Sequence, residues 1–303
     1  MATQQRHLPS TKQLRYFVAL VEEQHFGRAA ARCFVSQSAF SVAIQELESL
    51  LGANLVDRTN RSVTITALGK EIAVLARLCL QDLNALVEAA RGHAEPLRGP
   101  LQLGVIPTIA PFLLPRVLPK LRKEFPSLEL YLHEDVTEGL YALLMEGALD
   151  LVLLALPYPL AGVEEMALFE DRFRLAVRKG STLVDPTNYR FSRLHAGSVL
   201  LLREGHCLRE HAIEACKLRD SKKLNPFSAS SLLTLIEMVD ADLGITFLPE
   251  MAEDSAMLQR TQVMTYPLGE ATQRTIGLIW RRGSPRSTEF RRLGESITRH
   301  RKS

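Results

Sequence analysis

The sequence lacks any apolar run long enough to cross a membrane, and it carries only a small excess of charge. Of its 303 residues, 46% are hydrophobic and 23% are charged, with a formal net charge of +3. A transmembrane helix needs about 20 consecutive apolar residues, and residues 1–10 are polar, unlike a signal peptide. We therefore expect no membrane association. Because so small a net charge does not indicate a nucleic-acid partner by itself, a case for DNA binding has to rest on pattern.

Cysteine is also scarce. Four cysteines in 303 residues do not form the dense disulfide framework of a small secreted domain. We therefore expect a protein of the reducing cytoplasm, where a disulfide is a transient signal rather than a permanent cross-link. The sequence also has no phosphate-binding glycine loop and no acyl-transfer nucleophile elbow. We expect no cofactor, no resident metal and no enzymatic turnover.

Residues 203–216 hold the pattern most suggestive of chemistry. Cys207 and Cys216 lie nine positions apart, and Cys207 is flanked by His206 and Arg209. Cationic neighbours and a helix N-terminus lower the pKa of a cysteine towards neutrality and so favour its reactive thiolate. The pair is therefore a candidate for redox chemistry.

A helix predicted over 208–217 makes this pair more informative. Nine residues of helix rise about 13.5 Å, whereas a disulfide needs Cα atoms about 4.4–6.8 Å apart. Joining Cys207 to Cys216 would require the segment to unwind, which is the behaviour of a redox switch. The alternative is that both are structural, since free cysteine often packs as a small buried hydrophobe.

Residues 11–51 show the pattern of a helix-turn-helix unit. Helices are predicted over 11–24, 27–33 and 36–51, and Ser36 is a suitable N-cap for the third. The residues of this third helix predicted to face inward are Phe40, Ile44, Leu47 and Leu51. The second helix of such a unit enters the major groove of DNA. The residues we expect to contact DNA are Ser36, Gln37, Ser38 and Ser41.

Two further elements follow. Residues 55–66 alternate around a basic tip and predict a β-hairpin wing, with Arg58 and Arg61 placed to reach phosphate or the minor groove. Residues 67–93 predict one long helix, and its single apolar stripe favours pairing with a second copy of the chain. The stripe consists of Leu68, Ile72, Leu75, Cys79, Leu83, Leu86 and Ala90. Cys79 on this stripe and Cys33 in the compact N-terminal core are interpreted as packing residues.

From residue 101 onwards strands alternate with helices, which predicts a largely parallel α/β sheet. The pattern favours a two-lobed sensor domain similar to periplasmic binding proteins, with a ligand crevice at the strand ends. Thr108 and Thr137 are candidates for that crevice, although helix capping explains each hydroxyl equally well. The predicted domains are a winged helix-turn-helix at 1–66, a linker and dimerisation helix at 67–93, a hinge linker at 94–100, lobe I at 101–170 with 273–303, and lobe II at 171–272.

The first 66 residues resemble the winged helix-turn-helix of LysR-type transcriptional regulators. The matching segments are 14–20 (LRYFVAL), 25–30 (HFGRAA), 35–41 (VSQSAFS) and 44–48 (IQELE). The sensor half resembles the peroxide-sensing OxyR branch of that family. The segments that carry this resemblance are 103–108 (LGVIPT), 204–209 (EGHCLR), 244–249 (GITFLP) and 274–277 (RTIG).

The resemblance implies a division of roles. Cys207 would be the peroxide-reactive cysteine and Cys216 the resolving one. The residues implied for the peroxide pocket are Thr108, Thr137 and His206, supported by Arg209 and Arg274. The implied partners are double-stranded DNA, hydrogen peroxide, RNA polymerase and further copies of the chain, as a dimer of dimers. The segment 217–225 departs from the family pattern because it is more basic.

Three other functions remain open. A LysR-type regulator could bind a small organic effector in the crevice, with structural cysteines. His206, Cys207, His211 and Cys216 could sense a metal, although their spacing matches no compact Cys-x-x-Cys site. A peroxidase would use the same cysteines but leaves residues 1–66 unexplained.

Overall fold

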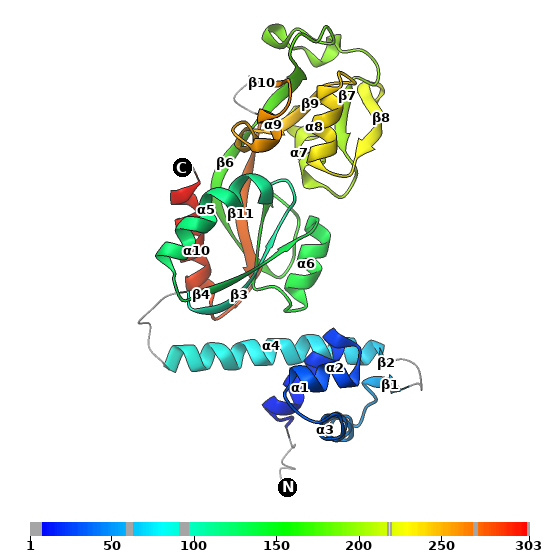
Figure 1. The fold of residues 1–303 in the computed structure, drawn as a ribbon, viewed down its shortest axis with the longest axis vertical. Helices are drawn as coiled ribbons and strands as arrows, with labels where there is room; N and C mark the ends of the chain where they lie inside the picture. The colour runs from blue at the N-terminus through cyan, green and yellow to red at the C-terminus, as the bar shows by residue number, and fades with distance from the viewer. Residues whose placement is uncertain are drawn as a thin grey trace. The chain divides into compact units, whose positions relative to one another are not determined.

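The computed structural model describes residues 8–58, 63–90, 97–216, 218, 220–268 and 272–301. The chain divides into two compact units (Figure 1). The first unit is Met1–Ala94 with Glu146–Ala148, and the second is Glu95–Met145 with Leu149–Ser303. In the described ranges no helix is long and apolar enough to cross a membrane.

Three short helices form the core of the first unit. They are α1 (Thr11–Glu23), α2 (Phe26–Arg32) and α3 (Gln37–Leu51). Two of them begin at serine caps, since the Ser10 and Ser36 hydroxyls accept hydrogen bonds from backbone N–H groups of the first turn. The residues that the helices bury completely are Phe17, Leu20, Ala29, Phe40, Ile44 and Leu47. The three predicted helices are confirmed to within one residue at each end.

Leu51 does not face the core as predicted, because its side chain is 37% exposed. It is the last residue of α3, and Gly52 ends the helix with a left-handed φ of 63°. Glycine adopts this conformation without steric cost. Because the chain turns at Gly52, Leu51 lies at the very end of the helix and its side chain stays partly exposed.

A small hairpin follows the three helices. β1 (Val56–Arg58) pairs antiparallel with β2 (Val63–Ile65), as predicted for the wing. The carboxylate of Glu48 in α3 holds the hairpin against the helices by accepting two backbone N–H groups at the start of β1, at 2.8 and 3.1 Å. Of the two arginines predicted at the tip, Arg58 ends β1, whereas Arg61 lies outside the described residues.

The long helix α4 (Ala67–Ala90) begins where the hydroxyl of Thr66 accepts a hydrogen bond from the N–H of Gly69 at 2.9 Å. The predicted helix over 67–93 is thus confirmed as far as Ala90, and its last three positions lie outside the described residues. Ala73 and Ala76 are buried, and α4 packs against α1.

The predicted apolar stripe of α4 is largely exposed in the single chain. Its most exposed members are Leu68, Leu75, Leu83 and Leu86, at 41–65%. The two cysteines interpreted as packing residues therefore differ. Cys33 packs against the core of the first unit, whereas Cys79 is exposed.

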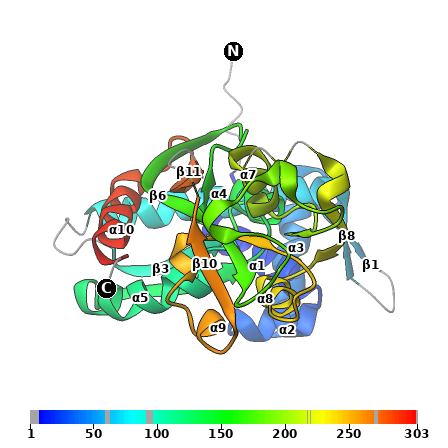
Figure 2. The same ribbon diagram turned by 90° about the horizontal axis from the view of Figure 1, so that it is seen from above.

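A seven-stranded sheet forms the frame of the second unit, in the order β10-β6-β11-β5-β3-β4, with β9 also paired to β6. The strands are β3 (Gly99–Val105), β4 (Leu128–Glu134), β5 (Leu151–Leu156), β6 (Val163–Arg178), β9 (Thr246–Pro249), β10 (Val263–Pro267) and β11 (Gln273–Arg281), beside a separate parallel pair β7 (Val199–Leu202) and β8 (Leu224–Ala229). The helices are α5 (Ala110–Glu124), α6 (Thr137–Met145), α7 (Cys207–Ala215), α8 (Leu232–Asp240), α9 (Ala256–Gln259) and α10 (Ser287–His300), with short 3-10 turns η1 (Pro186–Asn188), η2 (Phe191–Arg193), η3 (Ser221–Lys223) and η4 (Glu250–Ala252). Helices α5 and α10 pack together (Figure 2). The predicted α/β architecture is confirmed.

The prediction of a largely parallel sheet is wrong. β3 is parallel to β4 and β5, but β11 is antiparallel to β5 and β6, and β9 and β10 are antiparallel to β6. The reason is that β6 runs through both lobes and the chain returns beside it on β11 in the opposite direction.

Two hydrophobic cores divide the second unit into two lobes. Lobe I is centred on Trp280 and Phe290, whose rings lie 5.8 Å apart. Lobe II is centred on Phe173 and Phe247. Cys207 belongs to the first core although its helix follows strands of lobe II. The start of α7 is therefore at the junction between the lobes.

Candidate functional sites

Helix α7 carries the two predicted redox cysteines at its ends. Gly205 makes the turn before the helix with a φ of 92°, which favours glycine, and His206 is the extended N-cap residue. Cys207 is the first residue of the helix. Cys216 is its C-cap, with a backbone N–H that donates to the carbonyl of Ala212 at 3.0 Å.

The helix keeps the two thiols apart. Both cysteines are free, and the nine-residue step between them corresponds to about 13.5 Å of helical rise. Cys207 is buried in the lobe I core, whereas Cys216 packs against the lobe II core. A disulfide between them therefore needs α7 to unwind and at least one cysteine to leave its core.

The electrostatic prediction for Cys207 is wrong in its net direction. Burial raises the pKa of the Cys207 thiol, and the charge of Arg274 and the hydroxyl of Thr137 offset this only in part. Only 6% of the residue is exposed, and a thiolate loses its hydration in such surroundings. Cys216 differs because burial alone raises its pKa, to about 12. Of the two, Cys207 is thus the cysteine with groups that stabilise its thiolate.

Of the two sequence neighbours expected to supply positive charge to Cys207, one is bonded elsewhere and the other is neutral. Arg209 donates from Nη1 to the carbonyl of Leu202 at 3.1 Å. His206 is buried, and burial together with the charge of Arg203 lowers its pKa, so its ring is neutral near pH 7. The cation that acts on Cys207 is Arg274, which the sequence places far along the chain.

The metal-binding alternative gains no support from the geometry. It needs His206, Cys207, His211 and Cys216 to converge, but these residues span the whole length of α7. In the part of the chain that the structure describes, no group of three or more His, Cys, Asp or Glu side chains could hold a metal ion.

Arg274 is the centre of a buried polar network. Its Nε donates to Asp171 Oδ2 at 3.0 Å, its Nη1 to the hydroxyl of Thr108 at 3.1 Å, and its Nη2 to the Thr108 carbonyl at 3.0 Å. The other carboxylate oxygen of Asp171 accepts the backbone N–H of Met251 at 3.2 Å. All three side chains are buried. The network joins β11, β6, the turn after β3 and η4, and so connects the two lobes.

Sequence patterns missed Asp171. The only signal was an acid at the start of a segment otherwise expected to be a buried strand. A carboxylate that is 4% exposed requires a cationic or hydrogen-bonding partner, but the sequence does not show which residue supplies it. Pairing of β11 with β6 places Arg274 directly opposite Asp171.

The two candidate threonines are not helix caps. The Thr108 hydroxyl is engaged by Arg274, and the Thr137 hydroxyl is buried without a hydrogen bond of normal geometry. A buried hydroxyl without a partner is costly in a folded protein. Because Thr137 interacts with the Cys207 thiol, its hydroxyl can offer a hydrogen bond to a small polar molecule beside the sulfur.

The raised pKa of Cys207 predicts a pH dependence. The thiolate is the nucleophile, and its fraction grows about tenfold per pH unit below the thiol pKa. We expect the rate of Cys207 oxidation by hydrogen peroxide to rise roughly tenfold between pH 6 and pH 7 and again to pH 8. Trapping the sulfenic acid with dimedone, followed by mass spectrometry, measures this rate. A flat profile would show that Arg274 and Thr137 outweigh burial.

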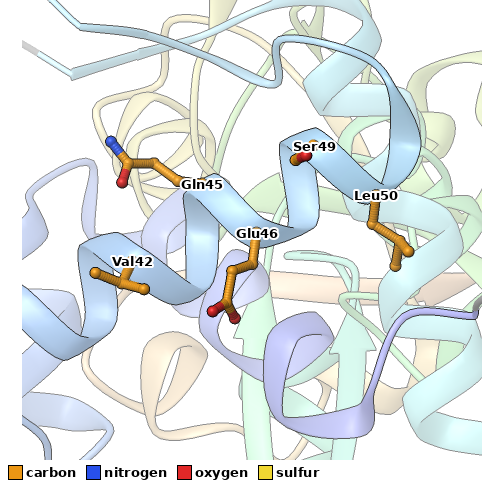
Figure 3. A pocket seen from close by; sticks show the side chains of 5 residues that line it. All are labelled: Val42, Gln45, Glu46, Ser49 and Leu50. Atoms are coloured by element: carbon orange, nitrogen blue, oxygen red, sulfur yellow. The ribbon is translucent and has the colours of Figure 1, made fainter.

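The predicted DNA-contacting residues lie at the start of α3. Gln37 and Ser38 are exposed, while the Ser36 hydroxyl accepts the N–H of Ala39 and so acts as the cap. Ser41 is half-buried. Further along the exposed side of α3 lies a shallow, open patch that sequence reasoning did not single out. This α3 patch is made of Val42, Gln45, Glu46, Ser49 and Leu50 (Figure 3).

Both units match families of known proteins. The model for the bacterial regulatory helix-turn-helix protein, lysR family, matches residues 11–70, and that for the LysR substrate binding domain matches residues 94–302. The chain is 41% identical to the HTH-type transcriptional regulator EstR of Acinetobacter baylyi, over 93% of this chain and 94% of that protein. It is 38% identical to the DNA-binding transcriptional dual regulator OxyR of Escherichia coli K12, over 94% of both. A full-length OxyR variant from Pseudomonas aeruginosa has a similar structure, with a TM-score of 0.82 and 34% identity, covering 96% of this chain and 95% of that one.

A winged helix-turn-helix followed by a long helix and a two-lobed ligand-binding fold defines a DNA-binding transcriptional regulator. The chain belongs to the LysR family of such regulators and is related to OxyR. This is a family of regulators, not of enzymes.

Proposed function

We propose that this LysR-type regulator senses hydrogen peroxide through Cys207 and Cys216. The observation that carries the proposal is the setting of Cys207. Its thiol interacts with the buried hydroxyl of Thr137 and with the charge of Arg274, and α7 separates it from Cys216. Similarity to OxyR supports the same assignment.

The chemistry takes two steps. The Cys207 thiolate attacks one oxygen of hydrogen peroxide, the O–O bond breaks, and the second oxygen leaves as hydroxide, which is protonated to water. The product is a Cys207 sulfenic acid. The Cys216 thiolate then attacks this sulfur, and a disulfide forms with release of a second water. Each cycle uses one peroxide, and a cellular dithiol reduces the disulfide again.

Unwinding of α7 assists the second step. Burial alone raises the pKa of Cys216, so this thiol becomes a better nucleophile once the helix end opens to water. The separation of the cysteines in the reduced fold thus prevents spontaneous pairing. The cycle requires a reducing compartment such as the cytoplasm.

The output is a change in how paired molecules contact DNA. The exposed apolar stripe of α4 is suited to pairing with a second copy, which would place two recognition helices on successive half-sites. Remodelling around α7 would then alter the contacts between sensor domains in a dimer of dimers. A changed spacing on DNA is one way to recruit RNA polymerase.

The two-lobed fold of the second unit supports one alternative function. In that alternative the regulator binds an organic effector between its lobes, with Thr108 and Thr137 in the crevice and structural cysteines. Substitution of Thr137 would then abolish induction by the effector, whereas loss of either cysteine would not.

Two measurements on the full-length protein test the proposal. DNase I footprinting on its operator, with and without hydrogen peroxide, should show a changed pattern of protection. Non-reducing mass spectrometry of the same samples should find a peptide pair joined through Cys207 and Cys216. Free thiols at both positions after peroxide treatment would rule out the sensing mechanism.

A further inference from the structure

The exposed side of α3 has a definite composition. At about 100° per residue, Ser38, Val42, Gln45 and Ser49 form one line along the helix, opposite the buried line that contains Phe40 and Ile44. Val42 is 51% exposed and stands among polar side chains on this side of the helix. Figure 3 shows the Gln45 amide extending from the helix, with Val42 and Ser49 one turn away on either side.

The same helix has no basic residue among its fifteen positions. Lys and Arg side chains neutralise the charge of DNA phosphates, so α3 has no cation of its own to hold it in the major groove of DNA. Glu46, which lies beside Val42 in the α3 patch, would repel a phosphate. This side of α3 is therefore suited to base edges rather than to the DNA backbone.

We propose that Val42 and Gln45 determine the operator sequence that this regulator reads. Val42 packs on the 5-methyl group of a thymine, and the Gln45 amide bonds to N6 and N7 of an adenine, which are the base features these side chains fit in the major groove. The α3 patch therefore contacts DNA. It continues the surface that Gln37 and Ser38 form at the start of the helix.

The test for Val42 removes one methyl group from DNA. Full-length protein selects its operator from randomised duplexes, and each thymine is then replaced by deoxyuridine. We expect one position per half-site to bind about fourfold more weakly, the value of burying one methyl-sized group. Val42→Ala should bind the thymine and deoxyuridine duplexes equally. Leu50→Ala, at the far end of the α3 patch, should still discriminate between the thymine and deoxyuridine duplexes.

The test for Gln45 uses the same operator. Gln45→Ala should lose about tenfold in affinity and should lose discrimination at one adenine only. Operators insensitive to every deoxyuridine, or a Val42→Ala protein that still discriminates, would overturn the proposal. A third outcome is that both variants bind DNA normally but lose transcription in a reaction with purified RNA polymerase. That result would assign the α3 patch to a protein partner and would also overturn the proposal.

A second observation concerns the basic segment after Cys216. Lys223 Nζ donates to the carbonyls of Phe191, at 2.9 Å, and of Ser192, and it lies 5.5 Å from the centre of the Phe191 ring. Close by, the Asn225 side chain donates to the Gly197 carbonyl at 2.7 Å. The end of this segment is therefore fastened to η2 and to the loop before β7.

This attachment bears on disulfide closure, and the following inference rests on the proposed peroxide sensing. Cys216 has to move by several ångströms to reach Cys207. The residues after Cys216 must move with it, and Lys223 holds the far end of this segment in place. Leu218, between them, is buried in the lobe II core. Any displacement that extends to Lys223 breaks two charge-assisted hydrogen bonds, which are among the stronger polar contacts in proteins.

We propose that Lys223 is a positioning residue that slows the second step of the switch and leaves the first unchanged. In Lys223→Met, sulfenic acid formation at Cys207 should keep its wild-type rate. Disulfide closure should become about fivefold faster, as expected when part of a charged hydrogen bond no longer opposes it. Lys223→Arg should stay close to wild type. Lys222→Met is the matched control, because that neighbouring lysine is exposed.

Rapid quenching after peroxide addition separates the two steps. Dimedone traps the sulfenic acid, iodoacetamide blocks free thiols, and mass spectrometry counts each species over time. Equal closure rates in wild type and Lys223→Met, or equal acceleration in Lys222→Met, would overturn the role of Lys223. Absence of a disulfide in every protein, with a persistent sulfenic acid, would overturn the proposed function as well, so the two failures are distinguishable.

Discussion

Cys207→Ser is expected to abolish the peroxide response while it leaves DNA binding of the reduced protein intact. A serine hydroxyl cannot be oxidised to a sulfenic acid, so neither step of the switch can begin. The substitution changes one atom at a buried site of the second unit, whereas the winged helix-turn-helix belongs to the first unit. Footprints with and without hydrogen peroxide should therefore become identical to that of the reduced wild type.

The chain offers a matched control for this experiment. Cys79→Ser also removes a thiol, but Cys79 is exposed and lies in α4, so the peroxide-dependent footprint should persist. If instead Cys207→Ser responded normally to an inducer in cells and Cys79→Ser did not, the redox centre would have to be assigned to α4. Normal induction of both variants would favour the organic-effector alternative.

Arg274→Met is expected to cause the largest loss of stability. It leaves the Asp171 carboxylate buried without its cation, and breaking a buried ion pair in this way costs about 3–5 kcal/mol. Removal of the charge should also raise the pKa of Cys207 further, because Arg274 is the main charge that lowers it. Urea unfolding measures the first effect and the rate of sulfenic acid formation measures the second.

A double-substitution cycle identifies the cause. Asp171→Asn removes the negative partner, and the Asp171→Asn, Arg274→Met protein has no buried charge left at this position. We expect the double variant to be more stable than the sum of the two single losses predicts, since residues in one buried network are coupled. Additive losses would show that Arg274 stabilises the junction between the lobes without its pairing to Asp171.

Local patterns predicted much of the fold. Helices of the first unit were predicted to within a residue because their signals are short-range: a serine cap at Ser36 and apolar residues at helical spacing. The hairpin and the long α4 follow from similar signals. Leu51 is an exception, since its spacing fits the buried face but its side chain stays partly exposed at the end of α3.

Strand direction is a different kind of property. Each strand of the second unit has its own apolar pattern, but whether two strands are parallel depends on which distant segments meet. The return of the chain on β11 beside β6 makes much of the sheet antiparallel, and residues within either strand do not encode this. Alternation of strands with helices therefore predicted the fold class and not the strand directions.

By itself the sequence determined the positions of Cys207 and Cys216 and the helix that separates them, because a helix start and a nine-residue step are local. Tertiary structure alone decided the environment of Cys207. Of its neighbours in the sequence, Arg209 donates to the carbonyl of Leu202 and His206 is held neutral by burial. Burial raises the pKa of Cys207, and the opposing charge comes from Arg274 on another strand. Desolvation and charge act through space, so they depend on which segments the folded chain brings together.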